Sequence, residues 1–307
     1  MTALMAESHK YLHFENSLMA KGHIVPEFYL KLFLDPNIPE GRSKEIWYYT
    51  KATKKWAHKG TKNVGFIDDY YVISDDDGNK IDLIEKKLAE IENLVSTIIK
   101  NKIHKRIPLT EEEKSLFSIF SMLMRTRVPS FINAMSGFSS NVLKQIIGAY
   151  HTNEKAFENI KAKFNLSEEY TQEFFNPDHW EFNTADMTKS FLLETIEAGA
   201  NALLNMNWTF LYSKGNDYFV TSDNPYYLSN NPATPGQRTL GHLEQRNFVT
   251  LPLGIHTCFL ATHQNLPYTL DVDSTIVKDV NLQTINQTEK QFYSPKKQFL
   301  GEDFLKK

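Results

Sequence analysis

Two kinds of hydrophobic pattern follow one another along this chain of 307 residues, and their order limits the folds that it can adopt. Between residues 44 and 74, short aromatic-rich segments alternate with turn residues, as in small β units. From residue 81 to 206, apolar side chains recur every three or four positions, which is typical of amphipathic helices. From residue 207 onward, short apolar strands return. The sequence therefore predicts an α+β fold, with a mainly helical middle and small β parts before and after it.

Individual elements can be placed within these blocks. We expect strands at residues 45–50, 55–57, 65–74, 208–213, 218–221, 247–253 and 256–262. We expect helices at residues 82–102, 110–135, 140–164, 167–175 and 184–206, and a closing helix at 274–293. Thr110, followed three residues later by Glu113, is a capping-box start for the second of these helices. Residues 229–244 read as a loop rich in Pro, Gly and Asn, and loops of this length are often functional.

The chain is long enough to bury a sizeable core. We expect residues 1–22 to be an N-terminal extension and residues 23–307 to form a single α+β domain. Within that domain, residues 23–80 are the β-rich part, residues 81–206 the helical part, and residues 207–307 the strand-rich part with the closing helix.

Composition indicates a reducing compartment and no membrane partner. Cys258 is the only cysteine, which excludes an internal disulfide and any site with several cysteine ligands. No stretch approaches the roughly 20 apolar residues needed to cross a bilayer, and the first 21 residues do not resemble a signal peptide. The net charge of −3 provides no overall attraction to nucleic acid or to an anionic membrane. We expect a soluble, cytoplasmic protein.

A histidine stands directly before a predicted helix start within residues 23–33. Pro26 fixes φ and needs no backbone donor, so it suits the first turn of a helix. Phe28 or Tyr29, together with Leu32 and Phe33, recur at helical spacing and would face a core. His23 is therefore held just before a helix N-terminus, where unpaired N–H groups favour negative charge. His23 is a candidate general acid or base and Tyr29 a candidate ligand-binding residue; the structural alternative is a helix cap.

The pattern His-x-x-Pro-x-x-Tyr-Leu-x-x-Phe of residues 23–33 resembles the opening signature of a widespread uncharacterised group, the domain of unknown function 4238. Further pieces agree with that group in order, and position 27 departs from it, with glutamate in place of glutamine. The pieces are residues 46–49, a helix carrying Glu85 and Glu92, and residues 127–129, 221–225 and 251–253. The resemblance covers residues 23 to 294. It implies no established activity and therefore no catalytic residues.

Acidic and basic groups occupy unusual positions on two of the predicted helices. Glu85 and Glu92 are seven residues apart, so they share one flank of their helix, roughly 10 Å apart along its axis. Arg127 falls within the apolar stripe of the next helix, whereas Arg125 faces the other way. A buried arginine needs a carboxylate or several carbonyls as partners, and we expect these from Glu85, Glu92 or Asp223. Pro129 should bend the helix beside Arg127.

A polar turn follows the short apolar strand at residues 218–221. Asp223, Asn224 and Pro225 end this strand, because proline cannot continue the ladder of a central strand. One interpretation places Asp223 on a metal or a substrate. The other is a local turn in which Asp223 or Asn224 bonds the neighbouring backbone.

Lysines alternate with aromatic residues between positions 44 and 62, where six lysines accompany one glutamate. Such a segment can follow a phosphate backbone while bases stack on the aromatic rings, and this would make it a docking surface for RNA. The simpler interpretation is the solvated side of a β-hairpin.

These residues fit two classes of function, and a third possibility is that the polar cluster only fixes the fold. The first is hydrolysis of a phosphodiester in RNA or a nucleotide. Its catalytic residues would be His23, Arg127, Asp223 and Asn224, with Tyr29, Glu85 and Glu92 binding the ligand. Carboxylate ligands would favour Mg²⁺ or Mn²⁺. The second class is a non-catalytic module that binds a small anionic ligand or a protein partner. The pattern carries no information on oligomeric state.

Overall fold

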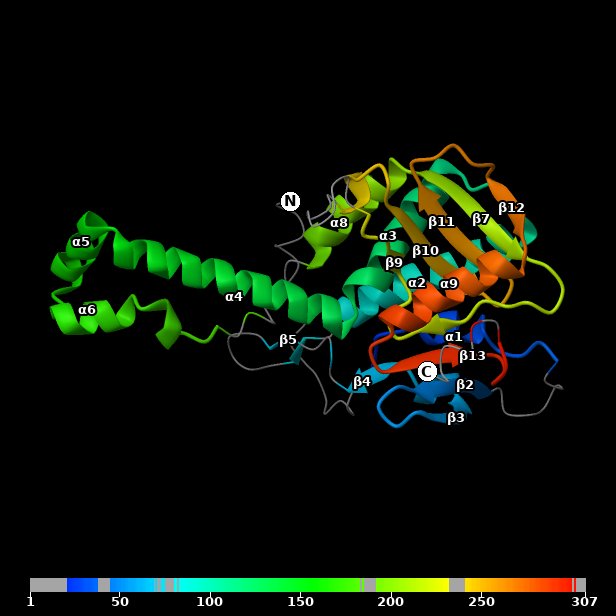
Figure 1. Cartoon of the computed structure of the whole chain (residues 1–307), viewed down its shortest axis with the longest axis horizontal. Coiled ribbons are helices and arrows are strands. Elements are labelled where there is room, and N and C mark those ends of the chain that lie inside the picture. Colours follow the sequence, from blue (N-terminus) through cyan, green and yellow to red (C-terminus); the bar gives the residue numbers. More distant parts are fainter. Residues whose placement is uncertain are drawn as a thin grey trace.

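Three helices from the middle of the chain form an arm that projects from the body of the molecule (Figure 1). The computed structural model describes residues 21–37, 45–68, 70, 73–74, 80–81, 83–182, 184, 192–231, 241–299 and 301. The arm consists of α4 (Pro129–Thr152), α5 (Glu154–Phe164) and α6 (Glu168–Phe174). The expected extension at residues 1–22 lies outside the described residues, apart from its last two positions.

The remaining helices belong to the body. The α-helices are α1 (Glu27–Lys31), α2 (Leu83–Asn101), α3 (Glu111–Thr126), α8 (Leu192–Leu204) and α9 (Ser274–Gln287). The short 3₁₀ turns are η1 (Thr61–Asn63), η2 (Ile103–Lys105), η3 (Pro177–His179), which lies along the arm, and η4 (Gly241–Leu243). Among the described residues, no helix combines the length and the apolar character that a membrane crossing requires.

Two larger sheets carry the body. The five-stranded sheet has the order β12 (Thr269–Val272), β7 (Asn207–Ser213), β11 (Thr257–Thr262), β10 (Phe248–Gly254) and β9 (Tyr227–Leu228), and only its β12–β7 pair is parallel. The four-stranded antiparallel sheet has the order β3 (Lys55–Gly60), β2 (Glu45–Thr50), β13 (Gln291–Ser294) and β8 (Thr221–Ser222). Two short pairs complete the strands, β1 (Lys21–His23) with β4 (Phe66–Asp68) and β5 (Ile73–Ser74) with β6 (Lys80–Ile81). The helical middle between β parts confirms the α+β prediction.

An aromatic core joins α3 to the five-stranded sheet. Phe117 on α3 lies edge-on to Phe259 of β11, with ring centroids 5.0 Å apart, and also contacts Trp208 of β7. Tyr29 and Phe33 from the N-terminal signature are fully buried. Because buried aromatic rings contribute large apolar areas, this cluster fixes α3 and α1 against the sheet.

The helix boundaries differ from expectation around Pro129. Instead of a bent helix over residues 110–135, α3 ends at Thr126 and α4 begins at Pro129. Val128 between them is extended, with ψ at 145°, and Pro129 takes the first helical position, where it loses no hydrogen bond. The start of α3 is as predicted: Glu113 N donates to the Thr110 hydroxyl at 3.2 Å, and Thr110 N donates to the Glu113 carboxylate at 2.9 Å.

The prediction of a closing helix over residues 274–293 is wrong in its last turns. Helix α9 ends at Gln287, and residues 291–294 form β13 between β2 and β8. The Asp223 carboxylate holds the main chain at residues 289–291 in a non-helical turn. Residues 291–294 then form backbone hydrogen bonds with β2, which they could not form as part of a helix.

Candidate functional site

Arg127 is the most deeply buried charge among the described residues, with 2% of its side chain exposed. Its position at the end of α3 follows from the helical stripe noted in the sequence. One guanidinium nitrogen donates to the Glu92 carboxylate on α2 at 2.9 Å. The other donates to the main-chain carbonyl of His23 at 2.5 Å. Arg127 therefore connects α2, α3 and β1.

His23 meets Arg127 through its backbone rather than through its imidazole. The residue lies in β1 opposite Phe66 of β4, and the two rings are 5.9 Å apart. Glu92 keeps 19% of its side chain exposed, so one edge of the ion pair reaches solvent. The side chain of Glu85, in the first turn of α2, lies outside the described residues.

The Asp223 carboxylate holds the turn that leads into β13. It accepts hydrogen bonds from the backbone N–H groups of Glu289, Lys290 and Gln291 at 2.9, 2.6 and 2.8 Å. Only 4% of the residue is exposed, and this burial raises the pKa of Asp223, although the three donors oppose the shift. The carboxylate therefore bonds to backbone, as in the turn interpretation, and not to Arg127.

Asn224 and Tyr29 also serve the fold. The carbonyl of Asn224 accepts a 2.7 Å hydrogen bond from the Gln287 amide, so the turn is tied to the end of α9. The Tyr29 hydroxyl donates to the Pro252 carbonyl at 2.5 Å and lies 2.9 Å from the Thr221 hydroxyl, which then donates to it. Burial raises the pKa of Tyr29 above its usual value. These contacts hold α1 between the two sheets.

Most of the lysine-rich segment forms the β2–β3 hairpin, and Lys51, Lys54, Lys55, Lys59 and Lys62 are exposed. Its aromatic residues are not all available for stacking. Trp56 packs edge-on against Phe292 of β13 at 5.3 Å and lies 5.5 Å from Tyr49. The solvated-hairpin interpretation accounts for this arrangement.

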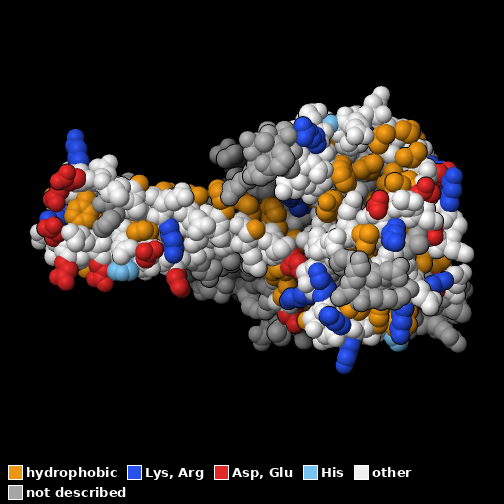
Figure 2. Space-filling model, in the orientation of Figure 1, with side chains coloured by type: hydrophobic (Ala, Val, Ile, Leu, Met, Phe, Trp, Pro, Cys, Tyr) orange, Lys and Arg blue, Asp and Glu red, His pale blue; other side chains and the backbone are white. Residues whose placement is uncertain are grey.

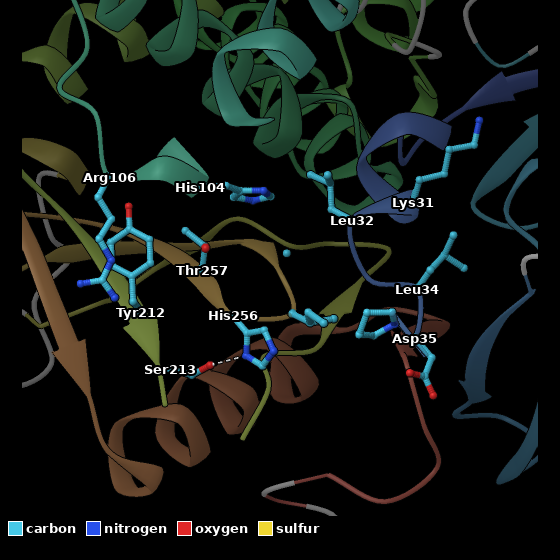
Figure 3. Close-up of a pocket in the computed structure, with 13 residues that line it drawn as sticks. Lys31, Leu32, Leu34, Asp35, His104, Arg106, Tyr212, Ser213, His256 and Thr257 are labelled. Atoms are coloured by element: carbon cyan, nitrogen blue, oxygen red, sulfur yellow. Dashed lines mark hydrogen bonds between the residues drawn. The ribbon is translucent and has the colours of Figure 1, made fainter. Parts of the chain in front are cut away.

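A pocket of about 590 Å³ opens at the C-terminal end of α1 (Figure 3). Four segments far apart in the sequence line it: the end of α1 with the loop after it, η2, the end of β7, and the turn between β10 and β11. Two of these segments, residues 29–36 and 251–257, contain or adjoin pieces of the family signature. Polar side chains from several of these segments face the same space in Figure 3.

His256 reaches this pocket in a defined tautomer. Its Nδ1 lies 2.9 Å from the Ser213 hydroxyl, which itself donates to the Asp217 carbonyl at 2.9 Å. Because the Ser213 proton is used on that carbonyl, the His256 Nδ1–H must be the donor to Ser213. In the neutral imidazole, the His256 Nε2 then carries the lone pair. Ser213 is not arranged as a nucleophile, since its proton does not point to His256.

His104 forms another wall of the pocket. Its Nε2 lies 2.9 Å from the Leu253 carbonyl, which can only accept, so Nε2 carries the proton. Burial lowers the pKa of His104, and the charge of Lys100 adds to this. Gly254 permits the close approach: its φ is +147°, and a Cβ there would lie 3.2 Å from the imidazole.

Two cations stand at the rim of the pocket. The guanidinium of Arg106 donates to Asp271 at 2.5 Å and lies 4.2 Å from the centre of the Tyr212 ring. Lys31 forms a 3.0 Å ion pair with Glu27 one turn earlier. Burial raises the pKa of Tyr212 to about 12, and its hydroxyl donates to the Ile103 carbonyl. Asp35 is the acidic residue of the lining.

The site residues predicted from the sequence thus fall into two structural groups. The structure also contains a pocket that sequence reasoning missed. Arg127, Glu92 and the His23 backbone come together, and Asp223 and Asn224 join the turn before β13. Within the described part of the chain, no three His, Cys, Asp or Glu side chains gather closely enough to hold a metal ion. The sequence feature that could have indicated this pocket is His256, which follows Gly254 and Ile255 at the tip of a hairpin.

Comparison with curated proteins and with solved structures gave no match. Comparison with protein families gave one, described as a protein of unknown function, DUF4238. This match extends over residues 21–298, almost the whole described chain, and the chain therefore belongs to the DUF4238 family.

Proposed function

We propose that this protein binds a small molecule with an anionic group in the pocket at the end of α1. The observation that carries this proposal is a cavity of about 590 Å³ whose rim holds Arg106 and Lys31. Ligand pockets commonly measure roughly 300–1,000 Å³ and combine apolar walls with a few polar groups. Here Leu32, Leu34 and Ile255 supply apolar surface between the polar side chains.

The two rim cations can exchange their present partners for a ligand at little cost. Arg106 and Asp271 are half-exposed, as are Lys31 and Glu27. Exposed ion pairs contribute only about 0–1 kcal/mol, because water screens them. The planar guanidinium of Arg106 can hold a carboxylate or phosphate through two parallel hydrogen bonds.

His256 and His104 would contact the uncharged part of the ligand. His256 offers the lone pair on Nε2 to a donor group. His104 is held uncharged by its lowered pKa, with its Nε2–H used on Leu253. A ligand with both an anionic end and a hydrogen-bond donor, such as a nucleotide, would use both kinds of contact.

Binding can be tested by thermal unfolding with inorganic phosphate, nucleoside monophosphates and citrate as probes. We expect at least one probe to raise the Tm of the wild type. Arg106→Gln and His256→Ala should reduce this rise, whereas Lys59→Gln, which removes a positive charge on β3, should leave it intact. Equal responses in all three variants would exclude the pocket as the binding site.

Phosphodiester hydrolysis by His23, Arg127, Asp223 and Asn224 stays a prediction. The binding proposal has better support, because the Arg127 guanidinium and the Asp223 carboxylate make their hydrogen bonds within the fold. Labelled RNA and nucleotides, with Mg²⁺ or Mn²⁺, provide the assay. Cleavage that His23→Ala leaves undiminished would exclude the role assigned to this residue. Docking of RNA on the β2–β3 hairpin and a cytoplasmic location are likewise expectations.

A further inference from the structure

Arg125 is a second arginine at the end of α3, and its environment differs sharply from that of Arg127. Its side chain is partly exposed, but Nη1 is buried and has no hydrogen-bond partner among the described residues. No carboxylate in the described part of the chain forms an ion pair with it. Burial lowers the pKa of Arg125, and its interaction with the Tyr226 hydroxyl opposes this shift.

The described groups around Arg125 are polar, and none of them is a carboxylate. The guanidinium carbon lies 5.7 Å from the centre of the Tyr226 ring. The Tyr226 hydroxyl lies 2.5 Å from the Nε2 of His242, and the His242 carbonyl accepts a 2.8 Å hydrogen bond from His263. Burial raises the pKa of Tyr226 above its usual value, so the phenol is protonated at neutral pH.

His242 is uncharged for related reasons. Burial lowers the pKa of His242 to about 4, and the neighbouring Arg125 and His263 reinforce the shift. At neutral pH its Nε2 can therefore accept the Tyr226 proton, and no carboxylate among the described residues pairs with Arg125. The cluster around this arginine consists of Arg125, Tyr226, His242 and His263.

A cation in such surroundings destabilises the fold unless a negative charge compensates for it. Burying a charge without a partner costs several kcal/mol, and burial is tolerated when an opposite charge and hydrogen bonds compensate. Arg127, two residues further on, obtains both from Glu92 and His23. Among the described residues, an acid pairs with Arg127 and none pairs with Arg125, so an external anion would complete the environment of Arg125.

The location allows access. Arg125 lies in the last turn of α3, near the start of the arm, and Tyr226 directly precedes β9. Figure 2 shows basic and hydrophobic side chains where the arm joins the body. Arg125, Tyr226, His242 and His263 share no residue with the lining of the pocket of Figure 3.

We propose that Arg125 anchors an oxyanion-binding site, in which a carboxylate or phosphate group binds the guanidinium beside the Tyr226–His242 pair. The guanidinium would donate through its Nη1–H groups, which have no partner among the described residues, and the anion would supply the negative charge. This site is independent of the ligand pocket proposed above.

Thermal unfolding in phosphate, sulfate, acetate and chloride at equal ionic strength tests the proposal. We expect phosphate, sulfate or acetate to raise the Tm of the wild type and of Arg106→Gln, relative to chloride. Phosphate and sulfate acting alone would identify a tetrahedral anion, and acetate acting as well would identify a carboxylate site. Equal Tm values in all four salts would overturn the proposal.

Variants of Arg125 separate a binding role from a structural one. Arg125→Met should abolish the anion effect, and in chloride it should unfold at the same temperature as the wild type or higher, because an unpaired buried charge is removed. A lower Tm in chloride, or an unchanged anion effect, would overturn the proposal. If Arg125→Met does not fold, the same conclusion follows as for a lower Tm.

Arg125→Lys provides the conservative comparison. It keeps the charge but loses the planar pair of donors, so we expect an apparent affinity for phosphate roughly tenfold weaker than that of the wild type. An affinity equal to that of the wild type would contradict recognition by the guanidinium.

Discussion

Arg127 and Glu92 form an ion pair at 2.9 Å that joins the α3–α4 junction to the middle of α2. The arginine is buried and the glutamate reaches solvent at one edge, so the pair is internal but not sealed. The second guanidinium nitrogen holds the His23 carbonyl at the end of β1. Three segments of the fold thus depend on one side chain.

This dependence predicts unequal single variants and a partly rescued double variant. Glu92→Met leaves a buried guanidinium without its acid and should lower the free energy of unfolding by about 3 kcal/mol. Arg127→Met should cost about 2–4 kcal/mol, because the His23 carbonyl loses its donor as well. The double variant should be clearly more stable than the sum of the two losses predicts. Urea unfolding provides the double-mutant cycle, and strict additivity would show that the pair contributes nothing.

The Asp223 carboxylate predicts a large effect from a small change. Asp223→Asn keeps the shape but offers one oxygen in place of two, so the backbone N–H groups at 289–291 lose a charged acceptor. We expect a loss of about 2–4 kcal/mol in the free energy of unfolding. Asn224→Ala serves as the neighbouring control and should cost about 1 kcal/mol. Equal losses would contradict the anchoring role of the carboxylate.

The lowered pKa of His242 predicts that stability falls on acidification. The folded state holds this histidine at a pKa of about 4, whereas an unfolded histidine titrates near about 6.5. Between these values the unfolded chain binds the extra proton, so the contribution is complete above about pH 6.5 and is lost as the pH falls toward 4. The loss amounts to at most about 3 kcal/mol, since the ring is partly exposed.

The matched variant isolates this effect. His242→Gln removes the titrating group, so its free energy of unfolding should depend less steeply on pH between 7 and 4.5 than that of the wild type. The contribution of His104, whose pKa is also lowered, is present in both proteins and cancels in the difference. Parallel pH profiles would contradict the assignment to His242.

Gly254 predicts a steric effect on the pocket wall. Alanine there would adopt φ near +147° and place its Cβ 3.2 Å from the His104 imidazole. We expect Gly254→Ala to cost about 2–3 kcal/mol. Gly215→Ala, at φ +64° with nothing within 4 Å of the added Cβ, should cost only about 1 kcal/mol. Adding His104→Ala to Gly254→Ala should restore part of the lost free energy of unfolding. If nothing is restored, the strain lies in the backbone alone.

The parts of the fold that the sequence predicts are those determined by neighbouring residues. The capping box of Thr110 and Glu113 is local, and so is the apolar stripe that buries Arg127. Strand β13 is different, because Gln291, Phe292 and Tyr293 continue the helical pattern of α9 as readily as they alternate. Its partner, β2, lies so far away in sequence that no local pattern reveals the pairing.

The candidate site shows the same limit. Helix arithmetic indicates Glu92 as a partner of Arg127, but the His23 carbonyl has no sequence signature, since every residue carries one. The pocket draws Lys31, His104, Arg106 and His256 from three separate segments. Residues that meet only through tertiary packing follow no spacing rule, and only a structure brings them into view.

The pairing of β2 with β13 leaves β2 unpaired on one edge while the chain is being synthesised. Gln291 donates to the Thr50 hydroxyl across 241 residues of sequence. At synthesis rates of about 5–20 residues per second, β2 waits roughly 12–50 s for the strand that completes its edge. Throughout that interval both edges of the hairpin are open, and the exposed lysines of β3, such as Lys55 and Lys59, discourage other nascent chains from pairing with the β3 edge.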